Sequence, residues 1–385
     1  MPQWDIDFNC RLNLNDPEIV AGIAKVEALC AVIQGIPLPP AVQQRIDSLN
    51  ILRAVRGTTG IEGTEVSETE VGEIIEAPPE KHVLIDSRQR AEQEVRNAAR
   101  VMRFVAWALG EDPDYSVTEE LVCAIHRLTT ENIDYDSNEP GVYRNHAVQV
   151  ATYVPPRTGE EVRTLMTKFI KWLHEGPPRA WPPVVRALAS HFYLIGIHPF
   201  GDGNGRTARG LESFLLYQGG INARGFYSLA NFYYQHRPEY VAMLDHCRFN
   251  TGSDITPFVK FALRGLVEEQ EFVHKEILAE VTIIAFRDFA RERLMIDGKL
   301  GTKPGERMYH FLLGLADQPI SISQLRKGGH PLSPLYRDVT TKTLSRDLNY
   351  LVEKELVKID ETGRIRANID VMRDFKAQVR FPGNA

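Results

Sequence analysis

The stretch His198-Pro-Phe-Gly-Asp-Gly-Asn-Gly-Arg-Thr-Ala-Arg209 separates two runs of apolar residues with helical spacing. The run before it covers residues 185–195, and the run after it covers residues 211–215. Apolar side chains that recur every three or four positions predict a helix with one buried face. The sequence therefore predicts a mainly α-helical protein in which this stretch, the motif loop, connects two buried helices.

The glycines and arginines of the motif loop favour binding of a phosphate group. Gly201, Gly203 and Gly205 stand at alternate positions, where they allow positive φ and a close approach of the backbone to a ligand. Arg206 and Arg209 open the second helix, and the free amides at the start of a helix attract anions. A guanidinium group can also bind two phosphate oxygens at once.

Two more side chains of the motif loop add chemistry. Asp202 is its only carboxylate, and Mg²⁺ in proteins usually takes one or two carboxylates together with substrate phosphates. His198 has the one side chain here whose ordinary pKa suits a general base near neutral pH. A Walker loop is excluded because Gly-Lys-Ser/Thr is missing, and a dinucleotide-binding loop because no strand precedes residues 203–208. The combination predicts a metal–nucleotide site with a base beside it.

Residues 198–209 resemble the core motif of the Fic family, H-P-F-x-D/E-G-N-G-R-x-x-R, and match it at every fixed position. The resemblance implies a Fic-type helical bundle that transfers AMP from ATP to a Ser, Thr or Tyr hydroxyl of a protein target, its own chain included. It implies ATP as the co-substrate and Mg²⁺ as the metal. Phe200 would be the apolar anchor that seats the loop in the core.

The resemblance also implies a role for each polar residue of the motif. His198 would deprotonate the target hydroxyl, and Asp202 would hold Mg²⁺. Asn204 and the loop amides would hold the α-phosphate. Arg206 would bind the β-phosphate and Arg209 the γ-phosphate. We therefore expect His198, Asn204 and Arg206 to act in catalysis.

Residues 58–63, Thr-Thr-Gly-Ile-Glu-Gly, follow a predicted helix over residues 41–55. Taken alone, they are typical of a helix end with glycine terminators. They also resemble the inhibitory motif of Fic proteins, S/T-x-x-x-E-G/N, with Thr58, Glu62 and Gly63 at the fixed positions. We call them the inhibitory segment. The resemblance implies that Glu62 pairs with Arg209 and keeps ATP in an unproductive pose, or that Glu62 orients a water for removal of AMP.

Residues 147–154 alternate between apolar and polar side chains and end at Pro155-Pro156, which predicts a strand. A surface hairpin is the simplest interpretation. By resemblance to Fic proteins, residues 145–156 would be a β-hairpin flap that captures the target segment by strand pairing. Tyr143 and Arg144 fit the family element P-G-x-Y/F-R, and we expect structural roles for them.

Further aromatic and histidine side chains lie on predicted helices on either side of the motif loop. Residues 232–249 predict a helix whose aromatic side chains, by their spacing, suit the core. One or more of Tyr233, Tyr234 and Tyr240 on this helix, Tyr234 first among them, are nevertheless expected to line the adenine pocket, because a purine needs an apolar slot. His126 lies on a predicted helix over residues 121–128 and is interpreted as a packing or surface residue outside the site.

The C-terminal part begins after a linker-like stretch over residues 298–305. Predicted helices cover 306–316, 322–327 and 340–356, and two predicted strands, 357–360 and 364–367, are joined by a turn at Gly363. The pattern resembles a winged helix-turn-helix whose Thr340, Thr341, Lys342, Thr343 and Arg346 would face a groove. Residues 321–380 carry twelve basic and eight acidic side chains in a chain of net charge −6, which suits DNA binding. Protein docking or dimer formation stays an alternative.

The whole chain of 385 residues suggests three parts: an N-terminal regulatory region (1–87), a catalytic core (88–297) and a winged-helix domain (298–385). A hydrophobic content of 43% and a charged content of 25% exclude global disorder. The four cysteines have no metal-binding spacing, and no signal peptide or membrane helix is recognisable. We expect a cytoplasmic enzyme that acts on a protein target and has no membrane partner. A homodimer is one expected arrangement of the chain. A DNA-binding regulator with a nucleotide-sensing core is the rival interpretation.

Overall fold

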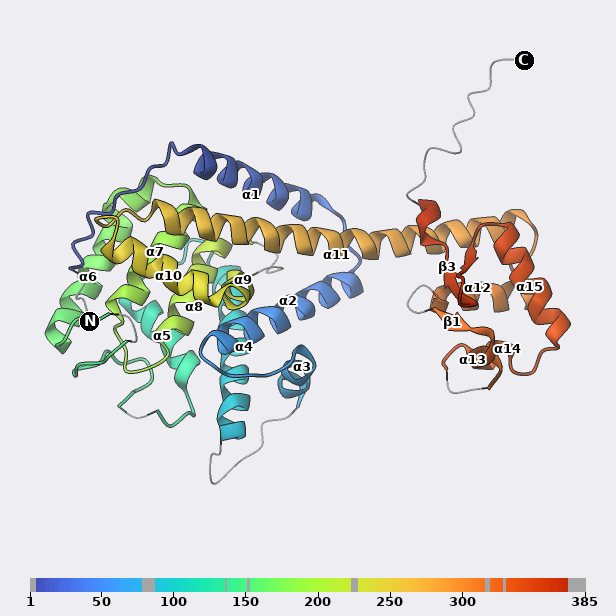
Figure 1. Ribbon diagram of the computed structural model, residues 1–385, viewed down its shortest axis with the longest axis horizontal. Coiled ribbons are helices and arrows are strands. Elements are labelled where there is room, and N and C mark those ends of the chain that lie inside the picture. The colour runs from blue at the N-terminus through green and yellow to red at the C-terminus, as the bar shows by residue number, and fades with distance from the viewer. Residues whose placement is uncertain are drawn as a thin grey trace, which may run out of the picture. The chain divides into compact units, whose positions relative to one another are not determined.

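The computed structural model describes residues 5–77, 87–135, 137–150, 153–222, 228–315, 319–327 and 330–372. The chain divides into two compact units, Met1–Lys275 and Glu276–Ala385 (Figure 1). The division falls inside the 41-residue helix α11 (Thr256–Ile296), whereas the sequence analysis placed a boundary after residue 297. The protein is mainly α-helical, as predicted.

The centre of the first unit is a pair of helices, α7 (Pro183–Ile197) and α8 (Asn204–Gln218), which pack against each other. Almost every side chain of α7 is buried, and a helix that is apolar on all sides belongs in a core. Pro183 starts α7 at the position where a missing backbone N–H does no harm. The prediction of a loop between two buried helices is confirmed.

Other helices of the first unit surround this pair. They are α1 (Pro17–Gly35), α2 (Pro40–Ile61), α3 (Glu68–Glu76), α4 (Ser87–Glu111), α5 (Glu119–Thr130), α6 (Gly159–Glu175), the 3₁₀ turn η1 (Pro177–Ala180), α9 (Leu229–Gln235) and α10 (Arg237–Phe249). Helices α4 and α5 contact α8, and α2 contacts both α4 and α9. Figure 1 shows α1 beside the first part of α11, where Gln270 donates a hydrogen bond to the carbonyl of Val26. This packing places the end of α2 close to the start of α8.

The predicted flap, residues 145–156, differs from a paired hairpin. Residues 151 and 152 lie outside the described residues, and the described remainder contains no strand, only a bridge at Val154. From residue 145 to 150 exposed and half-buried side chains alternate, so the period of two is present. The prediction of a strand over residues 147–150 is wrong, because alternation alone does not supply a neighbouring strand to pair with.

The second unit combines helices with a small antiparallel sheet. Its elements after α11 are α12 (Lys303–Leu315), β1 (Ile320–Ser321), α13 (Ile322–Lys327), α14 (Ser333–Tyr336), α15 (Thr341–Glu353), β2 (Val357–Ile359), β3 (Arg364–Ala367) and η2 (Ile369–Met372). The strand order is β1-β3-β2, and Ile365 pairs with Ile320 on one side and Ile359 on the other. Two strands of this sheet were predicted as the wing. The third, β1, and the short helix α14 were not.

The second unit has an apolar core of its own. Side chains of α12, α15 and β3 meet there, among them Phe311, Leu348 and Ile365. The predicted turn between β2 and β3 is confirmed, because Gly363 has a φ of 75° and its amide donates to the carbonyl of Asp360. Among the described residues, no helix is long and apolar enough to cross a membrane.

Candidate active site

The motif loop is fixed by its own side chains. His198 ends α7 in the left-handed conformation with a φ of 53°, and Gly203 precedes α8 with a φ of 70°. The Asn204 side chain accepts a hydrogen bond from the amide of Phe200 (2.9 Å) and donates to the Phe200 carbonyl (3.0 Å). Asn204 therefore braces the turn, and one N–H of its side-chain amide is left for a ligand.

Phe200 is fully buried, as expected of an anchor, and its ring stacks on His126 with 3.6 Å between ring centroids. The amide of Gly141 donates to Nδ1 of His126 (2.9 Å), so Nε2 carries the proton and donates to the carbonyl of Asp202 (3.0 Å). Burial lowers the pKa of His126 to about 4. His126 is thus a neutral support of the motif loop. The sequence interpretation placed it outside the site and missed this role.

His198 has the environment of a neutral base. Its Nδ1 lies 3.3 Å from the carbonyl of Ile195, which can only accept, so the proton sits on Nδ1 and Nε2 keeps its lone pair. Burial lowers the pKa of His198 to about 4, and the charges of Arg144 and Arg248 act in the same direction, opposed by Glu62. At neutral pH the ring is therefore uncharged and can accept a proton at Nε2.

Arg144 connects the flap to the motif loop. Only 3% of the residue is exposed, and it donates from Nε to the carbonyl of His198 (2.8 Å). Its Nη1 and Nη2 donate to the carbonyls of His146 and Pro156, each at 2.7 Å. One guanidinium group therefore holds both ends of the flap against the backbone of the candidate base. The structural role expected for Arg144 is confirmed.

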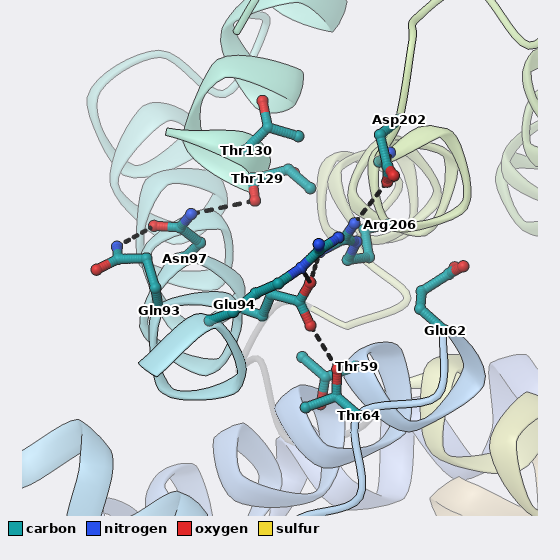
Figure 2. Close-up of polar contacts among 12 residues, drawn as sticks. Thr59, Glu62, Thr64, Gln93, Glu94, Asn97, Thr129, Thr130, Asp202 and Arg206 are labelled. Atoms are coloured by element: carbon teal, nitrogen blue, oxygen red, sulfur yellow. Dashed lines mark hydrogen bonds and ion pairs between the residues drawn. The ribbon is translucent and has the colours of Figure 1, made fainter. Parts of the chain in front are cut away.

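Arg206 is held by three neighbours. Its Nη2 donates to Oδ1 of Asp202 (2.9 Å), and its Nη1 donates to the hydroxyl of Tyr135 (2.7 Å) and lies 3.3 Å from Oε1 of Glu94. Figure 2 shows Arg206 between Asp202 and Glu94. Burial would lower the pKa of Arg206, but Tyr135 and the nearby carboxylates outweigh it and raise the pKa. The Nε atom is buried without a hydrogen-bond partner, so the group retains a donor for an anion.

Arg209 meets the inhibitory segment. Its Nη2 lies 2.6 Å from Oε1 of Glu62 and donates to the carbonyl of Thr58 (3.0 Å), while its Nε donates to the Thr58 hydroxyl (2.9 Å). Burial acts to raise the pKa of Glu62, but the charges of Arg209 and Arg206 prevail and lower it. Nη1 of Arg209 is buried without a partner. The contact between Glu62 and Arg209 that the resemblance implies is present.

The glycines around this contact fit their positions. A side chain at Gly205 would collide with the carboxylate of Glu62, so the close approach of Glu62 to the start of α8 requires glycine there. Gly63 has a φ of 99°, which favours glycine in the turn after Glu62. Tyr234 of α9 packs against Gly60 of α2, and the Arg56 guanidinium lies 5.6 Å from the centroid of the Tyr234 ring. Its role at an adenine ring stays a prediction.

The described residues contain no cluster of three or more His, Cys, Asp or Glu side chains that would hold a metal unaided. Asp202 stands alone, with 41% of its side chain exposed. Its Oδ1 accepts from the amide of Gly203 and from Arg206, and its Oδ2 accepts no hydrogen bond from the described residues. One free carboxylate oxygen beside an anion-binding loop fits Mg²⁺, which completes its shell with phosphate oxygens and water.

Comparison with known proteins supports this geometry. Residues 116–216 match the sequence profile of the Fic/DOC family. This part of the chain is a Fic/DOC family domain. It contains the whole motif loop, whereas Glu62 and Tyr234 lie outside the matched residues.

Relatives of the Fic domain are named protein adenylyltransferase Fic. The one from Aedes aegypti is 30% identical over 219 residues, which are 57% of this chain and 40% of the relative. The one from Drosophila melanogaster is 29% identical over 205 residues, which are 53% of this chain and 38% of the relative. The chain thus spans about two fifths of the length of these curated relatives.

Solved structures show the same fold. Fic-1 (residues 134–508) of C. elegans superposes with a TM-score of 0.54 at 25% identity, over 68% of this chain and 73% of that one. A Fic family protein of Desulfovibrio desulfuricans superposes with a TM-score of 0.56 over 95% of this chain and 98% of its own. At 22% identity the second likeness concerns the fold alone.

Proposed function

We propose that this chain is an autoinhibited protein adenylyltransferase that transfers AMP from ATP to a Ser, Thr or Tyr hydroxyl of a protein, its own chain included. The observation that carries the proposal is the pairing of a neutral His198, whose Nε2 is free to accept a proton, with two buried arginines that each keep an unpartnered N–H. Base and anion site lie within one loop. The names of the curated relatives agree with this reaction.

The transfer is a displacement at the α-phosphorus. Nε2 of His198 takes the proton from the target hydroxyl as its oxygen attacks, and the bond from phosphorus to the β-phosphate oxygen breaks, releasing pyrophosphate. Arg206 stabilises the negative charge on the leaving group, and Asn204 with the loop amides orients the α-phosphate. Asp202 would hold Mg²⁺, which neutralises phosphate charge when bound. The proton leaves His198 to solvent before the next turnover.

Inhibition follows from the two donors that Arg209 gives to the inhibitory segment. While Glu62 and Thr58 occupy its Nη2 and Nε, Arg209 offers only Nη1 to a γ-phosphate. The Glu62 side chain is 36% exposed, so the pair is weaker than the roughly 3–5 kcal/mol of a fully buried one. We expect the release of Arg209 to raise the rate about tenfold, which corresponds to about 1.4 kcal/mol.

The test is transfer of α-³²P label from ATP with Mg²⁺ onto the purified protein and onto a cell lysate. Wild type, Glu62→Gly and Glu62→Gly/His198→Ala are compared. We expect label to rise at least about tenfold with Glu62→Gly and to vanish in the double variant. No label in any folded variant that binds ATP would overturn the proposal. In that case the nucleotide-sensor reading, or removal of AMP with Glu62 as water-orienting carboxylate, would replace it.

We also propose that the second unit is a winged helix that binds DNA. Thr340, Thr341, Lys342 and Arg346 are exposed at the start of α15, and Thr343 is half-buried there. Helix α13 precedes this helix, and the β2–β3 turn follows it. A mobility shift at two salt concentrations tests this, because binding through phosphate contacts weakens steeply with salt. Failure to bind at low salt would leave protein docking. The homodimer and the cytoplasmic location stay predictions.

A further inference from the structure

Glu94 is a buried carboxylate that the proposed reaction does not use. It lies on α4 and only 6% of it is exposed. A buried charge needs partners of opposite charge or hydrogen-bond donors, and Glu94 has them on both oxygens. Figure 2 shows the carboxylate between Arg206 on one side and Thr64 on the other.

The two oxygens of Glu94 serve different parts of the site. Oε1 accepts a hydrogen bond from the hydroxyl of Tyr135 (2.8 Å) and lies 3.3 Å from Nη1 of Arg206, with Nε of Arg90 farther away at 3.5 Å. Oε2 accepts a hydrogen bond from the hydroxyl of Thr64. The partners of Oε1 belong to the anion site and its support, whereas the partner of Oε2 directly follows the inhibitory segment.

Thr64 closes the turn that presents Glu62. Its amide donates to the carbonyl of Thr59 (3.2 Å), and its hydroxyl reaches across to α4. The turn that carries Glu62 is therefore held by a side-chain contact on each side of Gly63. Glu62 binds Arg209, and Thr64 binds Glu94.

We infer that Glu94 is a positioning residue with a divided carboxylate: Oε1 orients Arg206 for the phosphates, and Oε2 latches the inhibitory segment through Thr64. The expected effect of Glu94 on AMP transfer rests on the proposed function. The expected effect on ATP binding does not, because ATP binding depends only on whether the inhibitory segment occupies Arg209.

The two roles have separate physical consequences. When the inhibitory segment leaves, Oε2 loses its donor in a buried place, so the latch favours the closed segment. Mg²⁺ held by Asp202 would compete with Arg206 for the negative charge of this carboxylate. Glu94 and Tyr135 then keep Nη1 in place, and its Nε stays available to the β-phosphate.

The test of the latch is Thr64→Val, which keeps the shape of the side chain and removes the donor. ATP affinity is measured by calorimetry, and label transfer is measured in parallel. We expect ATP binding to tighten and basal transfer to rise at least about tenfold, the effect of losing one hydrogen bond to a charged group. In the Glu62→Gly background the same substitution should change neither quantity. Thr69→Val on the exposed face of α3 is the matched control.

The test of the orienting role is Glu94→Gln in the Glu62→Gly background. This variant keeps size and one acceptor but loses the charge opposite Arg206. We expect KM for ATP to rise and kcat to fall, together about tenfold in kcat/KM. Glu92→Gln, two residues away on α4 and paired with Arg88, is the control that should leave both unchanged.

Specific outcomes overturn the inference. If Thr64→Val has the same effect with and without Glu62, the latch hypothesis is wrong. It is also wrong if Thr64→Val leaves ATP affinity unchanged while the protein keeps the wild-type melting temperature. A Glu94→Gln protein that unfolds at wild-type temperature and transfers AMP normally would remove the orienting role. If ATP affinity responds as expected but no variant transfers label, the latch stands and the proposed transfer fails.

Discussion

The motif loop and the inhibitory segment meet at Arg209, the last residue of the motif, and they are built in opposite ways. The motif loop is fixed by buried side chains, Phe200 and Arg144 among them. In the inhibitory segment residues 59–61 are buried at the end of α2, whereas Glu62 and Gly63 just after it are exposed. The difference teaches that the exposed turn with Glu62 can move while the motif loop keeps its shape. In the proposed enzyme, inhibition can therefore be reversed without unfolding the site.

The largest expected effect comes from removing the base within the loop. His198→Ala in the Glu62→Gly background should lower transfer by about 10²–10⁴, the usual contribution of a general base. ATP binding should remain, because His198 is not one of the side chains proposed to bind the phosphates. Quantitative label transfer with saturating ATP measures this, and an intact rate would remove His198 from catalysis.

The next largest effect is expected from Gly203→Ala, which strains the backbone of the motif loop. The φ of 70° and a close contact with the methyl of Thr130 both oppose a side chain there. The left-handed backbone alone costs about 1–2 kcal/mol in a residue other than glycine. We expect a lower melting temperature and at least about a tenfold loss of transfer in the Glu62→Gly background. A melting temperature and rate equal to those of the parent would show that the loop is less rigid than described.

The matching change in the inhibitory segment is Gly63→Ala. Its φ is 99°, but no atom lies within 4 Å of the added methyl group, so only backbone strain is introduced. The strain falls on the turn that places Glu62. Basal transfer should therefore rise about fivefold in the otherwise wild-type chain, with little change in melting temperature. A loss of activity instead would contradict the contrast between the two glycines.

The smallest effect is expected from pH. The pKa of Glu62 is lowered from 4.5, so its charge, and with it the pair with Arg209, persists as the pH falls and is lost only below that lowered value. The pKa of His198, lowered to about 4, keeps the base neutral over the same range. The ratio of Glu62→Gly to wild-type transfer should stay within about twofold between pH 8 and 5.5. Transfer by Glu62→Gly that falls by half near pH 6.5 would instead show that His198 titrates normally.

The sequence was sufficient for features that depend on local pattern. Periodicity placed the loop between α7 and α8, and the alternate glycines indicated a loop that approaches a ligand. The contact between Glu62 and Arg209 joins residues 147 positions apart and came from a family resemblance, because no local pattern specifies such a pair.

Supports that come from distant parts of the chain escaped prediction. Tyr135 reaches Glu94 across 41 positions and Arg206 across 71, and His126 reaches the loop across 76. Each lies on or beside a helix whose sequence fits ordinary packing. The strand β1, with two residues, is too short for any alternation to be seen. The flap shows the reverse case, in which residues 145–150 alternate but form no strand among the described residues.

Arg209 cannot bind Glu62 and a γ-phosphate through the same N–H groups, so in the proposed enzyme the productive pose of ATP and the closed inhibitory segment exclude each other. Thermodynamic linkage makes this exclusion reciprocal. If the closed segment lowers the affinity for ATP by some factor, bound ATP lowers the equilibrium constant for closure of the segment by the same factor. A macromolecule that captured residues 58–64 in the open state would therefore tighten ATP binding without touching the nucleotide, and a rise in cellular ATP would make the segment easier to capture.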